Sequence, residues 1–466
     1  MNISYEDFFK LSYSLIDLND EEYLKDEERL RYIISKIKVK NPKKYLKEDI
    51  VAEVPGSKSM TNRALLLAAL AEGESTVSGI LFSDDSNVFL QALKDVGFTL
   101  QIDMPEKRVM IQGKGGRLPR SQANIYVGSA GTAARFLTAM AAMSDGEFRF
   151  DASAQMKKRP MADLLKALED LGAGIQYLCE EGTFPVRVSG MGYRQPKAQV
   201  SINIDKSSQF LSALLMTAPI QFDELEIQLT GTRSALSYVK MTEQMMKQFG
   251  HAGVIREADD RYRVIAQGGY HARDYMVEPD VSAACYFYAM AAVTGGECLV
   301  RNMRQDSLQG DMKFLQVLEQ MGCQLSWGEK GLVLTGPEPG HLKGIEVDMS
   351  DFSDQTLTLA AIAPYADSPV HIRNVGHIRG QECDRLHAIC ENLGRMNVRC
   401  EEYEDGVKIY PGMPQPAEIE TYQDHRVAMA FAVTGVRADG IVISDPMCCR
   451  KTFENYFEVL DDLTKR

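Results

Sequence analysis

An amphipathic helix that ends at a glycine recurs at nearly constant spacing along this chain of 466 residues. Each copy reads like FLQALKDVG, with apolar residues three or four positions apart before the glycine. A glycine after the last helical turn takes the left-handed conformation that ends a helix. These glycines are Gly97, Gly172, Gly250, Gly322 and Gly394, which lie 75, 78, 72 and 72 residues apart. A period of this length predicts copies of one structural unit.

A second feature recurs with the same period: a short strand, a few polar residues, and then a helix that is apolar on nearly every side. Such a helix is expected to be buried. The six polar groups are Lys58-Ser59, Gly131-Thr132, Ser207-Ser208-Gln209, Asp280 with Ser282, Asp351 with Asp354, and Asp424-His425-Arg426. The two features together predict six copies of a βαβαββ unit, and the last copy closes the chain with a helix that begins at Phe453.

The repeat predicts an α/β (α+β) fold of two similar domains, each built from three units around buried helices. We expect the first three units in residues 57–276 and the last three in residues 48–56 plus 277–466. Residues 1–47 are expected to form a charged, helical extension that carries no evident chemistry. This extension either docks on the main body or on an oligomer partner, or it remains a solvated arm.

Charge divides the six polar groups into two sets. The first three carry Lys58, Arg63 and Arg135 and no carboxylate, whereas the last three carry Asp280, Asp354 and Asp424. Cations at a helix N-terminus oppose its dipole, so they indicate an anionic ligand such as a phosphate or a carboxylate. If the two domains face each other, a cationic wall meets an acidic one across a cleft that suits small-molecule chemistry.

Capping is the competing interpretation of these polar residues, because helix starts require side-chain acceptors in any case. It suits Ser282 and Asp351 best. It explains Arg63, Arg135 and Arg426 less well, since an arginine one turn inside an apolar helix is costly unless an anion meets it.

The overall composition excludes several classes of partner. A net charge of −13 and a pI near 5.2 argue against nucleic acid or an anionic membrane as the main partner. The nine cysteines are odd in number and lack the spacing of a metal site, so we expect no metal and reduced thiols in a cytosol. The N-terminus is acidic, and no apolar run of 18 residues follows, which predicts a cytoplasmic protein.

The polar groups and their surroundings are similar to motifs of the 5-enolpyruvylshikimate-3-phosphate (EPSP) synthase family. The resemblance runs from Ile50 to Arg466, and its motifs keep the family's order and spacing. They are PGSKSMTNRALLLAAL, VGSAGTAARFLTA, KKRPMADLL, SSQFLSALLM, SDQTLTLA, QECDRL, DHRVAMAF and KTFENYF. Any one of them is moderate evidence, but eight in register are strong.

The resemblance implies transfer of the enolpyruvyl group from phosphoenolpyruvate to the 5-hydroxyl of shikimate-3-phosphate, with release of phosphate and without metal or organic cofactor. It also implies a monomer whose two domains form an inside-out α/β barrel type of fold, with the chain crossing twice between them. Both substrates are small polyanions, as the cations at the helix starts require.

The resemblance assigns roles residue by residue. Lys58 would lie between the two substrates and count among the catalytic residues. The shikimate-3-phosphate set would be Lys58, Ser59, Arg63, Ser207, Ser208, Gln209, Tyr238, Asp354, His377 and Gln381. The phosphoenolpyruvate set would be Lys58, Gly131, Arg159, Gln209, Arg385, Arg426 and Lys451. Arg135 matches an arginine that supports the loop around Gly131.

Two carboxylates would move protons. Asp354 would accept the proton of the attacking hydroxyl, and Glu382 would exchange a proton with the methylene carbon of the enolpyruvyl group. The two acids need opposite protonation states, so their surroundings must separate their pKa values. The competing interpretation is that Glu382 beside Arg385 forms only a helix ion pair, which the motif makes the less favoured of the two.

The sequence departs from the family pattern at several positions. Gln381 stands where the family has lysine, which removes a cation on the shikimate side and predicts weaker substrate binding. His377 replaces a common asparagine, and Ser129 replaces the asparagine of GNAGT. The segment RSALSY before and including Tyr238 lacks the usual Ser-Lys/Arg-Pro. Gly131 keeps the glycine of the loop that receives glyphosate in sensitive members, so sensitivity is a hypothesis.

Two alternatives remain open at this stage. The sister enzyme that transfers enolpyruvyl to UDP-N-acetylglucosamine shares the six-unit fold, but it should carry a cysteine in a mobile glycine-rich loop, and no such GGC segment is present. A non-catalytic descendant that binds shikimate-type anions is supported only by Gln381 and by the extension. Phosphate release in the presence of both substrates separates these possibilities.

Overall fold

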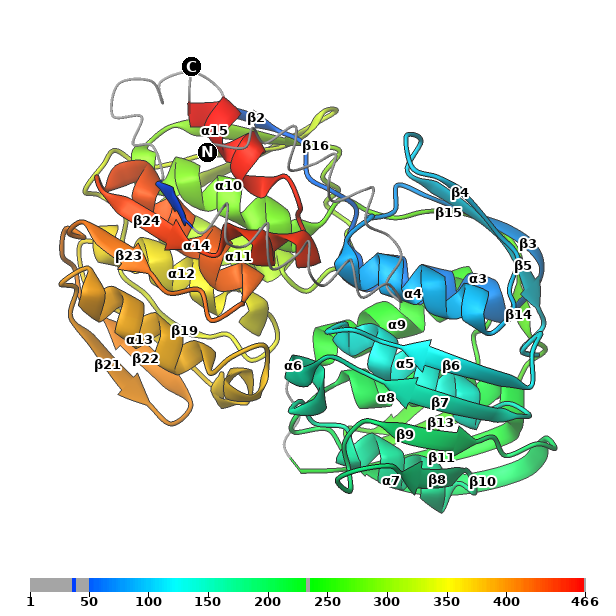
Figure 1. The fold of residues 1–466 in the computed structure, drawn as a ribbon. Coiled ribbons are helices and arrows are strands. Elements are labelled where there is room, and N and C mark those ends of the chain that lie inside the picture. The colour runs from blue at the N-terminus through cyan, green and yellow to red at the C-terminus, as the bar shows by residue number, and fades with distance from the viewer. Residues whose placement is uncertain (1–35, 39–49, 232–234, 465–466) are drawn as a thin grey trace. The chain divides into compact units, whose positions relative to one another are not determined.

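The computed structural model describes residues 36–38, 50–231 and 235–464 (Figure 1). It divides into two compact units. The continuous domain is Gly56–Glu278. The split domain is Met1–Pro55 with Pro279–Arg466, of which residues 36–38, 50–55 and 279–464 are described.

The continuous domain contains three repeats, and each repeat forms one sheet. The first has α3 (Lys58–Leu70), β3 (Ala71–Ser78), α4 (Asp84–Asp95), β4 (Leu100–Asp103) and β5 (Arg108–Lys114). The second has β6 (Gln122–Tyr126), α5 (Gly131–Ala142), β7 (Glu147–Asp151), α6 (Ala154–Lys157), α7 (Ala162–Asp170), β8 (Gly174–Tyr177) and β9 (Val186–Ser189). The third has β10 (Gln195–Asn203), α8 (Gln209–Gln221), β11 (Phe222–Thr230), α9 (Leu236–Gln248), β12 (Val254–Ala258) and β13 (Arg261–Ile265). The strands β14 (Tyr270–His271) and β15 (Asp274–Met276) follow.

The split domain contains the other three repeats. The fourth has α10 (Val281–Thr294), β16 (Glu297–Arg301), α11 (Met312–Gln320), β17 (Gln324–Gly328) and β18 (Gly331–Thr335), together with β2 (Ile50–Ala52). The fifth has β19 (Glu346–Asp348), the short 3-10 helix η1 (Ser353–Gln355), α12 (Thr356–Ile362), η2 (Ala363–Tyr365), β20 (Val370–Arg373), η3 (Gly376–Gly380), α13 (Arg385–Arg395), β21 (Cys400–Tyr403) and β22 (Gly406–Ile409). The sixth has β23 (Ala417–Ile419), α14 (His425–Arg437), β24 (Ile441–Ser444), η4 (Pro446–Lys451) and α15 (Tyr456–Thr464), with β1 (Lys36–Lys38).

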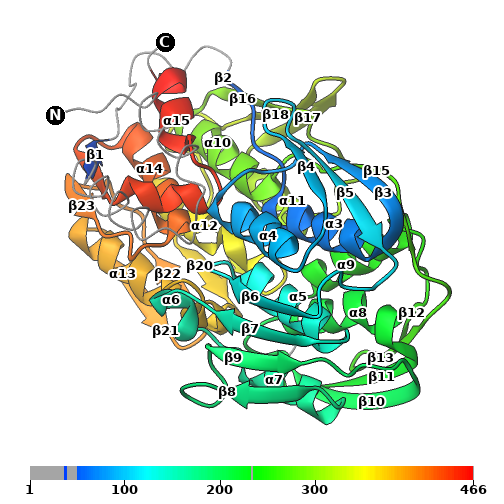
Figure 2. The ribbon, with the colours of Figure 1, turned by 45° about the vertical axis from the view of Figure 1, so that its right-hand side comes forward.

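Every complete repeat forms the same sheet, in which two parallel strands flank a buried helix and an antiparallel hairpin follows. The second repeat has the strand order β6-β7-β9-β8, and the fifth has β19-β20-β22-β21. Figure 2 shows the sheet of the second repeat lying over α5. The strands alternate between buried and exposed residues, as in β9, because one face packs on the helices and the other meets water.

The first strand of two sheets comes from a distant part of the sequence. β2 pairs in parallel with β16, so residues just before α3 belong to the split domain. β15 pairs in parallel with β3, so residues just before α10 belong to the continuous domain. The chain therefore passes twice between the domains. This confirms the two-domain α/β fold that the repeat predicted and the two crossings that the family resemblance implied.

The helices that follow the polar groups form the core of each domain (Figure 1). They are α3, α5 and α8 in the continuous domain and α10, α12 and α14 in the split domain. All twelve residues of α5 are buried, and so are all seven of α12. A helix that is apolar on every side can be accommodated only inside a shell of other elements.

The glycine pattern holds at four of its five positions. Gly97, Gly172, Gly250 and Gly322 have φ between 90° and 109° and follow the ends of their helices. Gly394 instead lies within α13, and Asn397 takes the left-handed conformation with φ 57°. The last helix, α15, begins at Tyr456, three residues after the expected Phe453, because Pro446–Lys451 and the turn after it fill the preceding segment.

The expectation of a helical extension falls mostly outside the described residues. Of residues 1–47, the structure describes Lys36–Lys38, and these form β1, so the helical prediction is wrong there. β1 pairs antiparallel with β24, which has β23 on its other side. The physical reason is the sixth repeat itself: among the described residues it has no hairpin after α15, and β1 occupies the edge of β24 that a hairpin takes in the other repeats.

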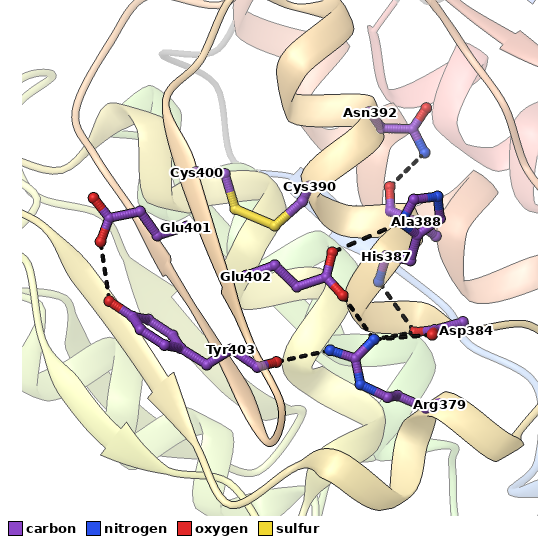
Figure 3. The surroundings of a disulfide bond; sticks show 10 residues. All are labelled: Arg379, Asp384, His387, Ala388, Cys390, Asn392, Cys400, Glu401, Glu402 and Tyr403. Carbon is purple, nitrogen blue, oxygen red and sulfur yellow. Dashed lines mark hydrogen bonds and ion pairs between the residues drawn. A yellow bond between two sulfur atoms is a disulfide. The ribbon is translucent and has the colours of Figure 1, made fainter.

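Two cysteines form a disulfide, which corrects the expectation that all thiols are reduced. Cys390 on α13 is bonded to Cys400 on β21, with Cα atoms 5.6 Å apart (Figure 3). Such a separation lies in the range that disulfides need. The packing of α13 against β21 creates this pairing, which spacing in the sequence could not reveal. The other seven cysteines are not bridged.

In the described part of the chain, no helix has the length and apolar character needed to cross a membrane.

Candidate active site

The continuous domain brings together the starts of its three buried helices. Asn62 on α3 donates to Thr132 on α5, and Arg135 Nη1 on α5 donates to Gln209 Oε1 on α8 at 3.1 Å. Among the described residues, the first turns of α3, α5 and α8 contain no acidic side chain, and their N-cap residues make no side-chain cap. The positive ends of three helix dipoles are therefore held together with no acidic side chain in their own first turns, which suits an anionic ligand.

Lys58 and Ser59 lie at the start of α3, as predicted, and both side chains are partly exposed. Lys58 Nζ pairs with Asp85 Oδ2 at 3.2 Å. Asp85 is a neighbour that sequence reasoning missed, because it lies on α4 and belongs to no polar group of the repeat. This ion pair fixes the position of the Lys58 ammonium group relative to α4.

Arg63 is enclosed within the domain and is 1 % exposed. Its guanidinium donates to Thr242 Oγ1 at 2.8 Å, Ser59 O at 3.0 Å, Ser212 Oγ at 3.3 Å and Tyr238 O at 3.4 Å. These acceptors are neutral, and burial lowers the pKa of Arg63 to about 10. Arg63 thus joins α3 to α8 and α9, and it connects the candidate residues Ser59 and Tyr238.

Gly131 lies between two arginines. A Cβ atom added at Gly131 would meet Arg135 Nη1 and would lie 3.1 Å from Arg159 Nη1 and Nη2. Arg159 Nη1 also donates to Ser129 O at 3.4 Å, so Arg159 is held against the loop before α5. Gln209 is fixed at the start of α8 by Arg135, and Ser207 Oγ accepts its backbone N–H at 3.3 Å.

The split domain gathers a second set of predicted residues around Arg385, which is 1 % exposed. Its guanidinium contacts Asp354 Oδ1 at 3.1 Å, Glu382 Oε2 at 3.0 Å and Asp424 Oδ2 at 2.8 Å. It also donates to Gln381 Oε1. Asp424, Glu382 and Asp354 together raise the pKa of Arg385 against the opposing effect of burial.

Two further cations complete this cluster. Arg426 Nη2 pairs with Asp354 Oδ2 at 2.8 Å, and Lys451 Nζ pairs with Glu382 Oε1 at 2.9 Å. Asp354 is therefore held by two guanidinium groups, and Glu382 by one guanidinium and one ammonium group. Three cations and three carboxylates balance, so an anionic ligand must compete with the carboxylates for the cations.

His377 lies beside this cluster, where its Nε2 is 2.8 Å from Ser353 Oγ. Burial lowers the pKa of His377, and the charge of Asp354 opposes that effect. Asp354 follows Ser353 in η1, so His377 contacts the turn that carries the candidate base.

The structure thus joins Asp354, Gln381, Glu382, Arg385, Arg426 and Lys451 into one cluster, with His377 beside it. Ser59, Arg63, Gly131, Arg159, Gln209 and Tyr238 are linked to the joined helix starts of the continuous domain, and Lys58, Ser207 and Ser208 lie at those starts. Asp424 was singled out only as a helix start, although it makes the shortest ion pair of Arg385. The cleft between the two sets stays a prediction. Among the described residues, no group of three or more His, Cys, Asp or Glu could hold a metal ion.

Known proteins that are similar to this chain show its family. The family model of EPSP synthase (3-phosphoshikimate 1-carboxyvinyltransferase) matches residues 40–460. A 3-phosphoshikimate 1-carboxyvinyltransferase of Trichormus variabilis is 47 % identical over 409 residues, which cover 88 % of this chain and 95 % of the relative. This chain belongs to the EPSP synthase family.

The family extends to plants and to solved structures. The chloroplastic 3-phosphoshikimate 1-carboxyvinyltransferase of Brassica napus is 40 % identical over 427 residues, covering 89 % of this chain and 83 % of the relative. An EPSP synthase structure from Acinetobacter baumannii superposes with a TM-score of 0.75 at 26 % identity, covering 92 % of this chain and 97 % of the other. As an EPSP synthase family member, the chain is an enolpyruvyl transferase of the shikimate pathway.

Proposed function

We propose that this chain transfers the enolpyruvyl group of phosphoenolpyruvate to the 5-hydroxyl of shikimate-3-phosphate through the two clusters described above. The joined helix starts of the continuous domain would bind phosphorylated substrate through Lys58, Ser59, Ser207, Ser208 and Gln209. Their uncapped backbone N–H groups and positive dipoles support this role. Tyr238 would line the same pocket.

Arg63 and Arg135 act differently from the other cations in this proposal. Arg63 is surrounded by neutral oxygen atoms of the domain, and Arg135 donates to Gln209 and to Pro160 O. Both would hold the binding residues in place, and Arg63 would raise the positive potential at Ser59. This modifies the expectation that Arg63 contacts the substrate directly.

Phosphoenolpyruvate carries a carboxylate and a phosphate, which we assign to Lys58, Gly131, Arg159, Gln209, Arg385, Arg426 and Lys451. Bidentate guanidinium pairing fixes the position of such groups as well as their charge. In the split domain, the bound anion would pair with the guanidinium and ammonium groups that form ion pairs with Asp354 and Glu382 in the structure.

This exchange provides a reason why Glu382 can take up a proton in the bound complex. Glu382 is stabilised as a carboxylate by Arg385 and Lys451, and it loses that stabilisation when the phosphate engages them. A carboxylate that loses its cations binds a proton more readily. Glu382 would then carry the proton that adds to the methylene carbon, while Asp354 would accept the proton of the 5-hydroxyl.

Addition forms a bond between the 5-oxygen and the central carbon of phosphoenolpyruvate. Elimination then breaks the bond from that carbon to the phosphate and returns a proton from the methyl carbon to Glu382. Cations already directed at the phosphate stabilise its departure. His377 and Gln381 would contact the shikimate side. A cytoplasmic monomer remains the expectation from the sequence.

One observation carries the proposal: a single buried guanidinium, that of Arg385, binds both candidate acids. The test is phosphate release after the purified chain is mixed with shikimate-3-phosphate and phosphoenolpyruvate, with each substrate alone as the control. We expect release only with both. Binding of shikimate-3-phosphate without any turnover would refute the enzyme and favour a non-catalytic anion-binding protein.

A further inference from the structure

Asp311, at the start of α11, has a buried carboxylate that does not cap its own helix. The aspartates that precede α10, α13 and α14 each accept a backbone N–H of the helix they begin. Within the described residues, the side chain of Asp311 makes no such cap. The carboxylate is 4 % exposed and is directed at other elements, so helix capping does not explain it.

The partners of this carboxylate come from two other elements. Asp311 Oδ2 accepts a hydrogen bond from Ser282 Oγ on α10 and another from Gln355 Nε2 at 3.2 Å. Gln355 is fully buried, and its Oε1 accepts from Thr358 Oγ1 at 2.9 Å. Asp311 thereby ties the start of α11 to the start of α10 and to η1.

Gln355 directly follows Asp354 in η1, which spans three residues. A hydrogen bond that fixes Gln355 therefore also fixes the backbone from which Asp354 projects. Asp354 reaches Arg385 and Arg426 from this turn. The turn that carries the candidate base is thus linked to Asp311 on another element.

Charge connects the same two carboxylates. Burial raises the pKa of Asp311 to about 7, with the negative charge of Asp354 as the next contribution. Arg426 on α14 and the hydroxyl of Ser282 act in the opposite direction, and Asp280 before α10 adds to the rise. The thiol of Cys285 on α10 also faces Asp311. Asp311 is thus placed to change its charge near neutral pH.

We propose that Asp311 is a positioning residue for Asp354. Asp311 fixes the turn that carries Asp354 through its hydrogen bond with Gln355, and it places a second carboxylate near that of Asp354. The inference rests on the proposed function, in which Asp354 accepts the proton of the attacking hydroxyl. Interacting carboxylates titrate as a pair, so ionised Asp311 makes Asp354 a stronger base. Turnover should therefore rise as the pH passes through the titration of Asp311.

The test compares Asp311→Asn with the wild-type chain by kcat and KM from about pH 5.5 to 9. Asparagine keeps the size of the side chain but cannot ionise. We expect the kcat of the variant to lack the rise near neutral pH. At pH 8 its kcat should be about tenfold below that of the wild-type chain, while both KM values change less than about twofold. Asp306→Asn, at an exposed position in the same loop, is the matched control and should keep the wild-type profile.

Ser282→Ala provides a second variant that does not depend on the stability of Asp311→Asn. It removes a hydrogen-bond donor that favours the ionised form of Asp311, so the rise of kcat with pH should move to higher pH by about half a pH unit to one pH unit. Thermal unfolding of each variant shows whether the fold is intact. An unmoved profile in Ser282→Ala, or a loss in folded Asp311→Asn that is equal at every pH, contradicts the inference.

Asp354→Asn separates this inference from the proposed function. If that variant keeps its turnover, the proposed function itself fails. If Asp354→Asn is inactive while Asp311→Asn keeps the wild-type profile, only the role of Asp311 is refuted.

Discussion

Arg385 and Asp424 form a buried bidentate ion pair, in which Nε lies 2.8 Å from Oδ2 and Nη2 lies 3.3 Å from Oδ1. The two side chains are 1 % and 0 % exposed. Asp424 also accepts the backbone N–H of Arg426 at 2.9 Å, so it orients one of the cations proposed to bind phosphoenolpyruvate and fixes the backbone of another. The pair therefore fixes the geometry of the charged cluster around Arg385 in the structure.

The first prediction concerns this pair. Asp424→Asn should raise KM for phosphoenolpyruvate by about 10- to 100-fold, because a buried guanidinium that loses its charged partner shifts toward the remaining carboxylates. Steady-state kinetics with varied phosphoenolpyruvate measure this. Asp306→Asn, which alters an exposed ion pair with Arg304 in the same domain, is the matched control and should leave KM nearly unchanged. Equal effects of the two variants would contradict the prediction.

The second prediction concerns the base. Asp354→Asn should lower kcat by orders of magnitude while binding of shikimate-3-phosphate stays nearly intact, because the carboxylate acts in the chemical step. Single-turnover kinetics and titration calorimetry check the two halves of this statement. Asp351→Asn, which alters a partly exposed ion pair with Lys313, serves as the control. Losses in binding and rate of equal size would mean that Asp354 only positions the substrate.

The third prediction concerns Gly131. Gly131→Ala should raise KM for phosphoenolpyruvate, because the new methyl group displaces Arg135 and Arg159 from the loop. Glyphosate should inhibit the wild-type chain in competition with phosphoenolpyruvate, and the variant should resist it. Gly269→Ala, where an added Cβ meets nothing within 4 Å, is the control. Inhibition that is not competitive with phosphoenolpyruvate would overturn the hypothesis of a shared site.

The fourth prediction concerns Gln381, where the family has lysine. Gln381→Lys adds a positive charge to the shikimate side and should lower KM for shikimate-3-phosphate by about three- to tenfold at low salt, with a smaller effect at high salt. Gln381→Met matches its length without the charge and separates the charge from the lost hydrogen bond to Arg385. If both variants give the same KM, the missing cation does not limit binding.

The fifth prediction concerns pH and stability. His251 is fully buried against Tyr270, and burial lowers its pKa from the usual 6.5. The unfolded chain therefore takes up this proton at a higher pH than the folded chain. Neutral His251 makes its full contribution to the free energy of unfolding above pH 6.5. That contribution is lost as the pH falls from 6.5 through the lowered pKa of the folded chain.

His251→Gln should accordingly show a weaker fall in the unfolding midpoint between about pH 6.5 and 5 than the wild-type chain. Denaturant unfolding at several pH values measures the difference. His271→Gln, at an exposed position of the same domain, is the matched control. A slope in His251→Gln equal to that of the wild-type chain would show that His251 does not contribute.

Much of the fold could be predicted because hydrophobic periodicity is a local property. A helix that is apolar all round, such as α5, must be buried wherever it lies, and a glycine such as Gly97 ends its helix through its own backbone conformation. Gly394 departs from the pattern because α13 continues through it and Asn397 takes over the left-handed position. The local signal there was ambiguous between two residues three positions apart.

The site was predictable in its residue types but not in its pairings. The sequence pattern indicated that Arg426 requires an anion, and the family resemblance assigned Arg385 and Lys451 to phosphoenolpyruvate. Neither showed that carboxylates of this chain already meet these cations. Asp311 escaped attention because its sequence position marks it as an ordinary helix cap. Its contacts with Ser282 and Gln355, 29 and 44 residues away, exist only after three helix starts converge.

The amino-acid sequence alone determined six repeats and their buried helices, since each follows from spacing and residue type along the chain. It did not determine the charge of each domain, because the acidic set of the split domain also holds three cations in ion pairs. Only the tertiary structure decided that Asp424 holds Arg385, that Arg63 is enclosed by neutral oxygens, and that Cys390 meets Cys400. The physical reason is that such contacts depend on how helix ends and strands from separate segments pack, and a packed distance leaves no trace in the local pattern of the residues that make it.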